Sequence, residues 1–145
     1  MKRQIIGWRE WLALPELGIA RIKAKIDTGA RTSALHTFSI EAMTVSGRSK
    51  VRFGIHPFQN RTDMEKYCTA DVVDERWVTD SGGHKEKRLV IVTTVQFGPE
   101  SWPIEITLTN RETMRFRMLL GRAAMKRRFT VNPDKSYLLS TPKKS

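Results

Sequence analysis

The stretch 24–33 places an aspartate at the end of an apolar strand, followed by small and hydroxyl-bearing residues. Asp27 is followed directly by Thr28 and Gly29. Because Gly29 has no Cβ, the backbone there can pass close to a partner strand. The Thr28 hydroxyl can brace the turn through hydrogen bonds. A carboxylate fixed in such a turn can act as a general base on water, so we expect Asp27, Thr28 and Gly29 to form a catalytic turn.

The chain contains one Asp-Thr-Gly sequence, whereas hydrolysis by carboxylates needs a pair. Two carboxylates a few ångströms apart cannot both ionise, so they share one proton. The charged member activates water, and the protonated member polarises the scissile carbonyl. A single copy therefore predicts that a second subunit supplies the other Asp27 about a two-fold axis. In the plainer interpretation, Asp27 is a turn residue that braces its own backbone.

A second element follows about ninety residues later, where Met118–Arg122 places apolar residues and a glycine before a short helical run. Four stretches carry a resemblance to a known family, and they are Asp27–His36, Val78–Gly83, Ile104–Arg111 and Met118–Arg122. They resemble a bacterial family labelled ATP-dependent zinc protease or RimK-associated protease, which has a retropepsin-like fold. The resemblance extends from about Gly7 to about Tyr137. It implies an aspartic-type endopeptidase that acts as a homodimer, with the apolar-apolar-Gly strand packed beside the catalytic loop.

The residues directly after the catalytic turn are expected to contact the substrate. The resemblance places Ala30, Arg31 and Thr32 within the motif. Arg31 could hold an acidic substrate residue, or it could form a salt bridge within the dimer. The sequence leaves these two interpretations equally open.

A second sequence of the aspartic type occurs at Asp80, Ser81 and Gly82. It does not follow a long apolar strand, and no second apolar-apolar-Gly element follows it at a comparable distance. Together with Gly83 it is typical of the tip of a hairpin, here spanning 74–88. A retropepsin has its flap, the lid that closes on substrate, at this place. We therefore expect these four residues to lie in a substrate-binding flap rather than in a second catalytic loop.

The spacing of apolar residues predicts an all-β fold with one short C-terminal helix. In the stretch 19–26 the residues Ala20, Ile22, Ala24 and Ile26 are expected to share one face. Further strands are expected at 8–14, 38–42, 51–55, 67–73, 89–97, 102–108, 114–118 and 138–139, and a helix at 122–129. Many short strands separated by turns predict a closed, retropepsin-like β-barrel. The length predicts one domain over 1–145, with an ordered core over about 7–139.

The zinc and ATP in the family label find little support in the residues. The three histidines are His36, His56 and His84, and there is no His-Glu-x-x-His or paired-cysteine spacing. A metal-dependent peptidase using Asp27, His36 and a distant third ligand remains the alternative, but we predict no metal and no cofactor. The chain has no P-loop sequence. Family proteins are associated with ATP-grasp ligases that append glutamate, so an ATP requirement would belong to that partner.

The chain is strongly basic, with 26 Lys and Arg against 15 Asp and Glu and a net charge of +11. Such a charge attracts anions, and a cluster of Arg122, Lys126, Arg127 and Arg128 favours a protein or peptide substrate of acidic character, including one that carries added glutamates. RNA is compatible with the same charge, although nucleic acid is the less favoured partner. A non-catalytic module that binds acidic peptide or RNA is therefore a further alternative.

The remaining sequence features predict a cytoplasmic protein. No window approaches the eighteen or so apolar residues of a membrane span. The stretch 1–10 lacks the apolar region of a signal peptide. Cys68 is the one cysteine, which excludes an internal disulfide and fits a reducing compartment.

Overall fold

The computed structural model describes residues 3–57, 64–79, 82–110 and 115–140. In chain order the strands are β1 (Gln4–Ile6), β2 (Arg9–Leu14), β3 (Ile19–Asp27), β4 (Ser33–His36), β5 (Ser39–Val45), β6 (Arg48–Ile55), β7 (Lys66–Asp71), β8 (Asp74–Thr79), β9 (Lys85–Phe97), β10 (Glu100–Thr109), β11 (Met118–Gly121) and β12 (Phe129–Val131). A 3₁₀ turn, η1 (Pro15–Leu17), and a short helix, α1 (Arg122–Met125), complete the described elements.

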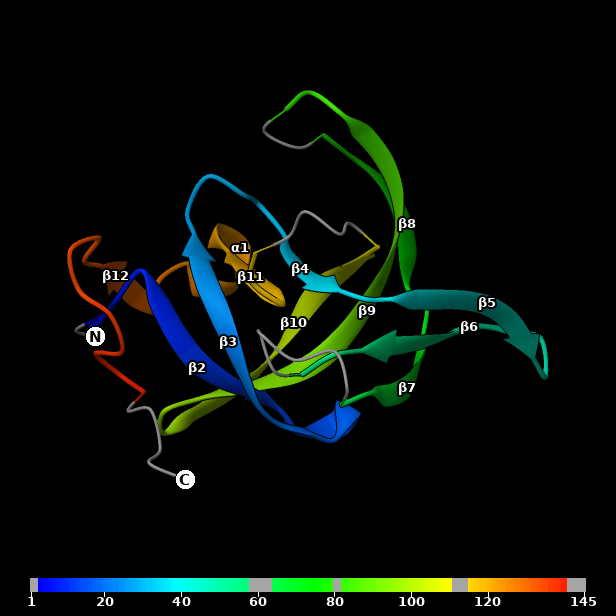
Figure 1. Ribbon diagram of the computed structural model, residues 1–145, viewed down its shortest axis with the longest axis horizontal. Helices are drawn as coiled ribbons and strands as arrows, with labels where there is room; N and C mark the ends of the chain where they lie inside the picture. The colour runs from blue at the N-terminus through cyan, green and yellow to red at the C-terminus, as the bar shows by residue number, and fades with distance from the viewer. Residues whose placement is uncertain (1–2, 58–63, 80–81, 111–114, 141–145) are drawn as a thin grey trace.

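Six strands pair into a barrel-like ring (Figure 1). Their order is β10-β4-β11-β3-β2-β9, and β9 pairs in turn with β10, so the order returns to its start. β8 pairs antiparallel with the first half of β9. The β-rich fold predicted from the short alternating strands is therefore confirmed.

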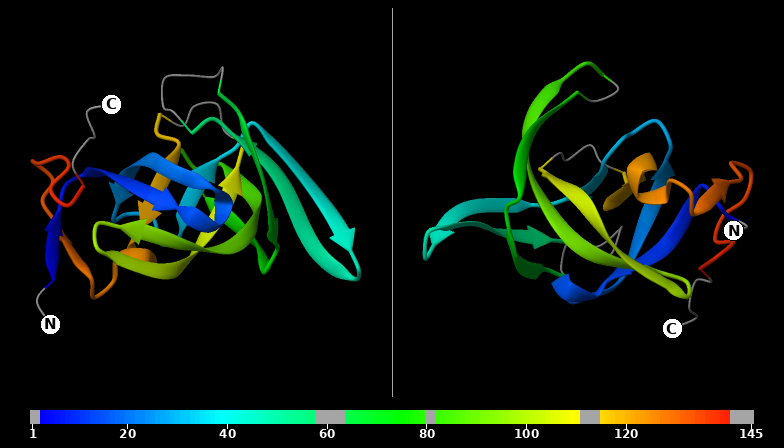
Figure 2. Two further views of the ribbon diagram at one scale, coloured as in Figure 1. Left: turned by 90° about the horizontal axis from the view of Figure 1, so that it is seen from below. Right: turned by 180° about the vertical axis from the view of Figure 1, so that it is seen from behind.

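Two smaller sheets extend from the ring. β5, β6 and β7 form an antiparallel sheet that projects away from the ring as an arm in every view (Figures 1 and 2). β1 and β12, the first and the last strand of the described residues, pair in parallel. The arm turns at Ser46 and Gly47, both at positive φ, as is typical of a tight β-hairpin.

The core lies inside the ring and follows the strand alternation. Fully buried side chains include Ile22, Leu35, Phe97, Ile106 and Met118, each from a different strand. Burying a large apolar side chain contributes about 1.5–3 kcal/mol. The ring is thus stabilised by residues from strands that are far apart in the sequence.

A bulge in β3 changes the expected alternation. Leu12 pairs with Ile22, but Leu14 pairs with Ile19, so β3 has one extra residue between these pairs. Ile19 is buried and Ala20 is exposed. The prediction that Ala20 shares the core face was therefore wrong, because the extra residue reverses the facing of the strand before the bulge.

The helix is shorter than predicted, and the strands expected at 114–118 and 138–139 are shorter or do not form. α1 ends at Met125, since Arg127 takes a left-handed φ of 68° and Phe129 begins β12. Phe129 packs on Phe97 and Trp102 in the core, which holds this segment as a strand. Of the strand expected at 114–118, the structure assigns only Met118 to a strand, and Met114 lies outside the described residues.

The expected strand at Leu138 and Leu139 does not form. Instead, the backbone N–H groups of Leu138 and Ser140 donate to the buried carboxylate of Glu10, at 2.8 and 3.0 Å. Gly7 N–H and the Ser140 hydroxyl also donate to this carboxylate. The Glu10 carboxylate therefore accepts the backbone hydrogen bonds that a neighbouring strand would otherwise accept. In the described part of the chain, no helix has the length and apolar composition needed to span a lipid bilayer.

Candidate active site

β3 brings Asp27 to one end of the ring. Ile22, Ala24 and Ile26 are buried, while Lys25 between them is exposed. This alternation leaves Asp27 half-buried at the last position of the strand. Because β11 runs parallel to β3, Gly121 pairs directly with Asp27. The two elements singled out in the sequence therefore lie side by side.

Gly121 is required here by the close approach of two backbones. A Cβ at this position would lie 2.6 Å from the carbonyl carbon of Thr32 and 2.9 Å from the backbone nitrogen of Ser33. Real Cβ atoms do not approach a backbone so closely. The Gly121 N–H also donates to Ser33 Oγ at 3.0 Å. The loop after Asp27 thus packs directly on β11.

The start of α1 holds the same loop from the other side. Arg122 N–H donates to the carbonyl of Ala30 at 2.8 Å, and Ala123 N–H donates to that of Arg31 at 3.0 Å. The Arg122 guanidinium also donates to the carbonyl of Gly29, at 3.2 Å. Three successive carbonyls of the loop, from Gly29 to Arg31, therefore accept hydrogen bonds from the start of α1, two from backbone N–H groups and one from the Arg122 side chain.

Within the turn, Gly29 N–H donates to Asp27 Oδ1 at 3.1 Å. Asp27 thus braces its own turn, as the plainer interpretation of the sequence expected, and its carboxylate remains at a partly exposed surface. Thr28 is exposed, and its hydroxyl has no hydrogen-bond partner in the described part of the chain. The bracing expected of Thr28 is provided within one chain by Ser33 and by α1 instead.

The segment 74–88 forms a hairpin. β8 and β9 pair from Asp74 with Val90 to Thr79 with Lys85. Figure 1 shows the described arms of this hairpin extending beyond the ring at the same end as the loop between β3 and β4. Asp80 and Ser81 lie outside the described residues, while Gly82 and Gly83 lead into β9. On the hairpin, Trp77 is 69% exposed.

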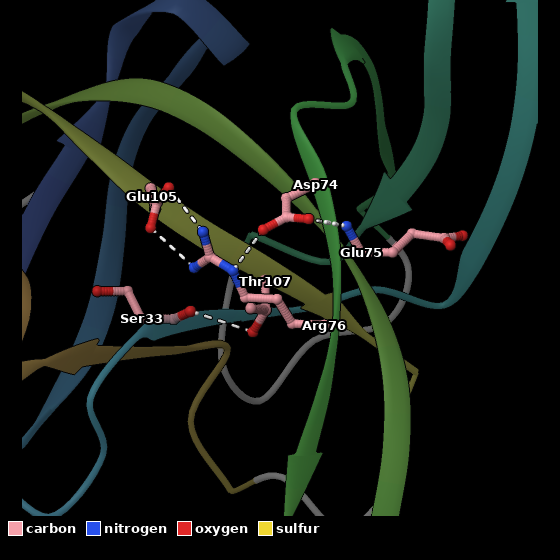
Figure 3. A network of polar contacts seen from close by, with 6 residues as sticks. All are labelled: Ser33, Asp74, Glu75, Arg76, Glu105 and Thr107. Atoms are coloured by element: carbon pink, nitrogen blue, oxygen red, sulfur yellow. Dashed lines mark hydrogen bonds and ion pairs between the residues drawn. The ribbon is translucent and has the colours of Figure 1, made fainter.

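An ion-pair network joins the hairpin to the ring (Figure 3). The two terminal nitrogens of Arg76 on β8 bind the two carboxylate oxygens of Glu105 on β10, at 2.8 and 3.0 Å. Arg76 Nε binds Asp74 at 2.7 Å. These hydrogen bonds lower the pKa of both Glu105 and Asp74 below their usual range. Beside them, Thr107 donates to the carbonyl of Ser33 at 3.2 Å, so the same face of β10 contacts the loop that follows Asp27.

Sequence reasoning singled out Gly121, the turn at Asp27 and the hairpin, but it did not find the pairing of Arg76 with Glu105. These residues are 29 positions apart on different strands, and no local pattern marks them. Ser33 and Arg122 were noted only as parts of a motif and of a basic cluster. Their contacts with Gly121 and Gly29 are what hold the loop.

The described residues contain no group of three His, Cys, Asp or Glu side chains placed to hold a metal ion. His36 is buried on β4, and His56 stacks on Phe38 with its Nδ1 at 3.2 Å from the carbonyl of Met64. The alternative metal site from Asp27 and His36 is therefore not assembled within the described part of this chain.

Residues 5–142 match the RimB-like family, described as retropepsin-like aspartic endopeptidase RimB. The chain belongs to the RimB-like family. This match agrees with the turn at Asp27, its partner strand β11 and the β-rich ring. The resemblance to a retropepsin-like family, which the sequence motifs indicated, is thus confirmed.

Several relatives of this chain carry a different name. The chain is 45% identical over 135 residues to a protein of Shewanella pealeana named probable alpha-L-glutamate ligase. It is 43% identical over 138 residues to a protein of the same name from Parasynechococcus marenigrum. The matches cover 93% and 95% of this chain but 30% of each relative. This chain therefore spans less than a third of the length of those relatives.

A solved structure has the same fold. A Legionella pneumophila protein of unknown function superposes with a TM-score of 0.78. The match covers 95% of this chain and 99% of the other, at 24% sequence identity. The arrangement of strands is thus shared with an experimentally determined structure.

Proposed function

We propose that this chain is an aspartic-type endopeptidase whose active site is completed by Asp27 of a second subunit. The observation that carries the proposal is the position of Asp27, at the end of β3, paired with Gly121 and followed by a loop fixed from both sides. Rigid placement of a carboxylate is what general base catalysis requires. The match to a family described as aspartic endopeptidases supports this assignment.

The proposed reaction uses the two carboxylates as one unit. The charged Asp27 takes a proton from a water molecule, and the oxygen of that water attacks the carbonyl carbon of the scissile bond. The protonated Asp27 of the other subunit donates to the carbonyl oxygen. As the tetrahedral intermediate collapses, the first Asp27 gives the proton that it took from water to the nitrogen, the C–N bond breaks and the amine leaves. The hydroxyl that formed from the carbonyl returns its proton to the second Asp27, so the pair again shares one proton. In the proposed dimer, the exposed Thr28 and Gly29 would face the second copy of the turn.

The substrate class follows from charge and from the relatives. The net charge of +11 attracts acidic chains, and the relatives are named as glutamate ligases. We therefore expect a protein or peptide of acidic character, including one that carries added glutamates, and a functional link to an ATP-grasp glutamate ligase. In this proposal the hairpin of β8 and β9 acts as the flap, and its exposed Trp77, Gly82 and Gly83 contact the bound peptide. Asp80 and Ser81, expected from the sequence to share this role, lie outside the described residues.

The test is cleavage of a diverse peptide pool, read by mass spectrometry. Wild type is compared with Asp27→Asn and with Asp134→Asn, a matched control in an exposed turn. Each is assayed with and without a chelator. Cuts that vanish only in Asp27→Asn and survive the chelator support the proposal. Cuts lost to the chelator favour a metal-dependent peptidase, and no cuts by a folded protein favour a binding module.

The dimer is tested by mixing subunits. If each site needs two Asp27 residues, adding excess Asp27→Asn protein to wild type should reduce activity toward zero, because mixed dimers have one carboxylate. Adding the same amount of Asp134→Asn should not reduce it. Activity that stays proportional to the wild-type protein alone would show that one chain suffices.

A further inference from the structure

A pocket of about 560 Å³ lies between β10 and α1, beside the loop that follows Asp27. Thr32 and Ser33 of that loop form one wall, and Trp102 and Glu105 of β10 form another. α1 and the turn that follows it contribute a third wall. This pocket is not the catalytic turn, but it shares a loop with it.

The turn after α1 makes the pocket basic. Lys126, Arg127 and Arg128 line it in succession. Arg128 lies 3.6 Å from Glu100 and stacks over the ring of Trp102. Lys126 and Arg127 form no ion pair with any residue that the structure describes. Two cations of the pocket therefore have no ion-pair partner among the described residues.

The one acidic residue of the lining does not neutralise them. Both carboxylate oxygens of Glu105 are bound by Arg76, at 2.8 and 3.0 Å (Figure 3). The charge of exposed Arg31 also acts on Glu105 and contributes to its lowered pKa. Arg76 therefore already binds the one carboxylate of the pocket lining. Lys126 and Arg127 in the turn after α1 remain available to an external anion.

The backbone of the turn holds these cations in place. Lys126 N–H donates to the carbonyl of Arg122 at 2.9 Å, and Arg128 N–H donates to that of Met125 at 2.9 Å. Between them Arg127 has a φ of 68°, a left-handed conformation that glycine adopts without strain. A strained conformation at a long charged side chain is a feature that clusters at binding sites.

The lining favours acidic peptide over nucleic acid. Single-stranded nucleic acid is held by exposed aromatic rings on which bases stack. Trp102 is the aromatic residue of the lining, and it is 7% exposed. Its indole N–H donates to the carbonyl of Ala124, and Arg128 covers its ring. The pocket therefore offers cations but no free ring face.

We propose that this pocket binds carboxylates of an acidic peptide at a site separate from the scissile bond. The proposal rests on the peptidase function and extends it, because an extended chain passing the loop at Arg31 and Thr32 leads from the catalytic turn to the pocket. Lys126 and Arg127 bind the carboxylates and so select substrates with several acidic residues on one side of the cleaved bond. The site raises affinity for such substrates without taking part in bond breaking.

The test measures binding rather than turnover. The full chain carrying Asp27→Asn, which should not cleave, is titrated against fluorescein-labelled hexaglutamate, with fluorescence anisotropy as the readout. On this background Lys126→Gln and Arg127→Gly each remove one cation, and glycine fits the φ of Arg127 without strain. Lys135→Gln, in an exposed turn of the C-terminal segment, removes the same charge elsewhere.

We expect Lys126→Gln and Arg127→Gly each to weaken Kd by about three- to tenfold, the loss of one charge-assisted contact, and Lys135→Gln to leave it nearly unchanged. Equal weakening by all three variants would mean general charge attraction and would overturn the proposal, as would no weakening by any. Tighter, pocket-dependent binding of a single-stranded oligonucleotide of equal charge would also overturn it. Cleavage that does not depend on Asp27 would overturn the proposed function, whereas this assay reports on the pocket alone.

Discussion

Arg76 on β8 donates two parallel hydrogen bonds, of 2.8 and 3.0 Å, to the carboxylate of Glu105 on β10. β9 lies between these strands, so the pair crosses a strand and ties the hairpin to the wall of the ring. A planar guanidinium fits a carboxylate in this two-point geometry, whereas the ammonium group of lysine does not. The pair therefore positions the hairpin as well as balancing charge.

Replacing Arg76 by lysine should loosen the hairpin while keeping its charge. Both side chains of the pair are more than a third exposed, so the loss of stability should be at most about 1 kcal/mol. Hydrogen exchange of the β8 and β9 amides should nevertheless become faster, while exchange in β3 and β11 stays unchanged. The matched control is Arg48→Lys, which alters the exposed ion pair between Arg48 on β6 and Asp71 on β7. Unchanged exchange in β8 of Arg76→Lys would contradict a positioning role.

The same network should respond to acid. Hydrogen bonds from Arg76 lower the pKa of Glu105 and of Asp74. A lowered folded-state pKa means that the stabilisation is present above the usual carboxylate pKa and is lost as the pH falls through the lowered value. The carboxyl carbon NMR shift of Glu105 should thus titrate with a midpoint below the ordinary value for glutamate, and Arg76→Gln should return that midpoint toward the ordinary value. A midpoint for Glu105 that is the same in both proteins would refute the pairing in solution.

Gly121→Ala should damage the candidate site more than the fold. The added Cβ would lie 2.6 Å from the backbone of Thr32, so the loop after Asp27 must move. We expect a stability loss of about 1–3 kcal/mol from overpacking. Because small displacements of catalytic groups cost about a hundredfold in rate, peptide cleavage should fall much further. Gly47→Ala, whose Cβ would meet nothing within 4 Å in the turn of the arm, should lower stability yet keep activity.

Glu10→Gln should release the C-terminal segment. The Glu10 side chain is buried and accepts hydrogen bonds from Gly7, Leu138 and Ser140. An amide presents only one acceptor oxygen, so several buried donors would lose their partner, at a cost of about 3 kcal/mol. Urea denaturation should show this loss, and proteolysis should cut near residue 138 first. Glu65→Gln, on an exposed carboxylate, should change neither result.

Short stretches of the sequence determine part of this architecture. The alternation in β3 beyond its bulge, the turn at Ser46 and Gly47, and the paired strands of the hairpin all depend on neighbours within a few residues. So does the appearance of Asp27 at the end of an apolar strand. Local backbone preference and side-chain period decide such features, and they can therefore be predicted from the sequence.

Other features depend on which distant segments meet. The early end of α1, where Phe129 packs on Phe97 and Trp102, and the hydrogen bond from Leu138 to Glu10 each reverse a local expectation. In each case a contact with a distant segment outweighs the local pattern, because core packing and buried hydrogen bonds contribute more than backbone propensity.

The sequence by itself determined the β-rich class and the position of Asp27 at the end of its strand. Only the tertiary structure placed Gly121 beside Asp27, showed why residue 121 must be glycine, paired Arg76 with Glu105 and formed a basic pocket next to the loop that follows Asp27. The physical reason is that pairing register and strand order bring together residues dozens of positions apart. That register is fixed by the packed core as a whole, so no single stretch of the chain encodes it.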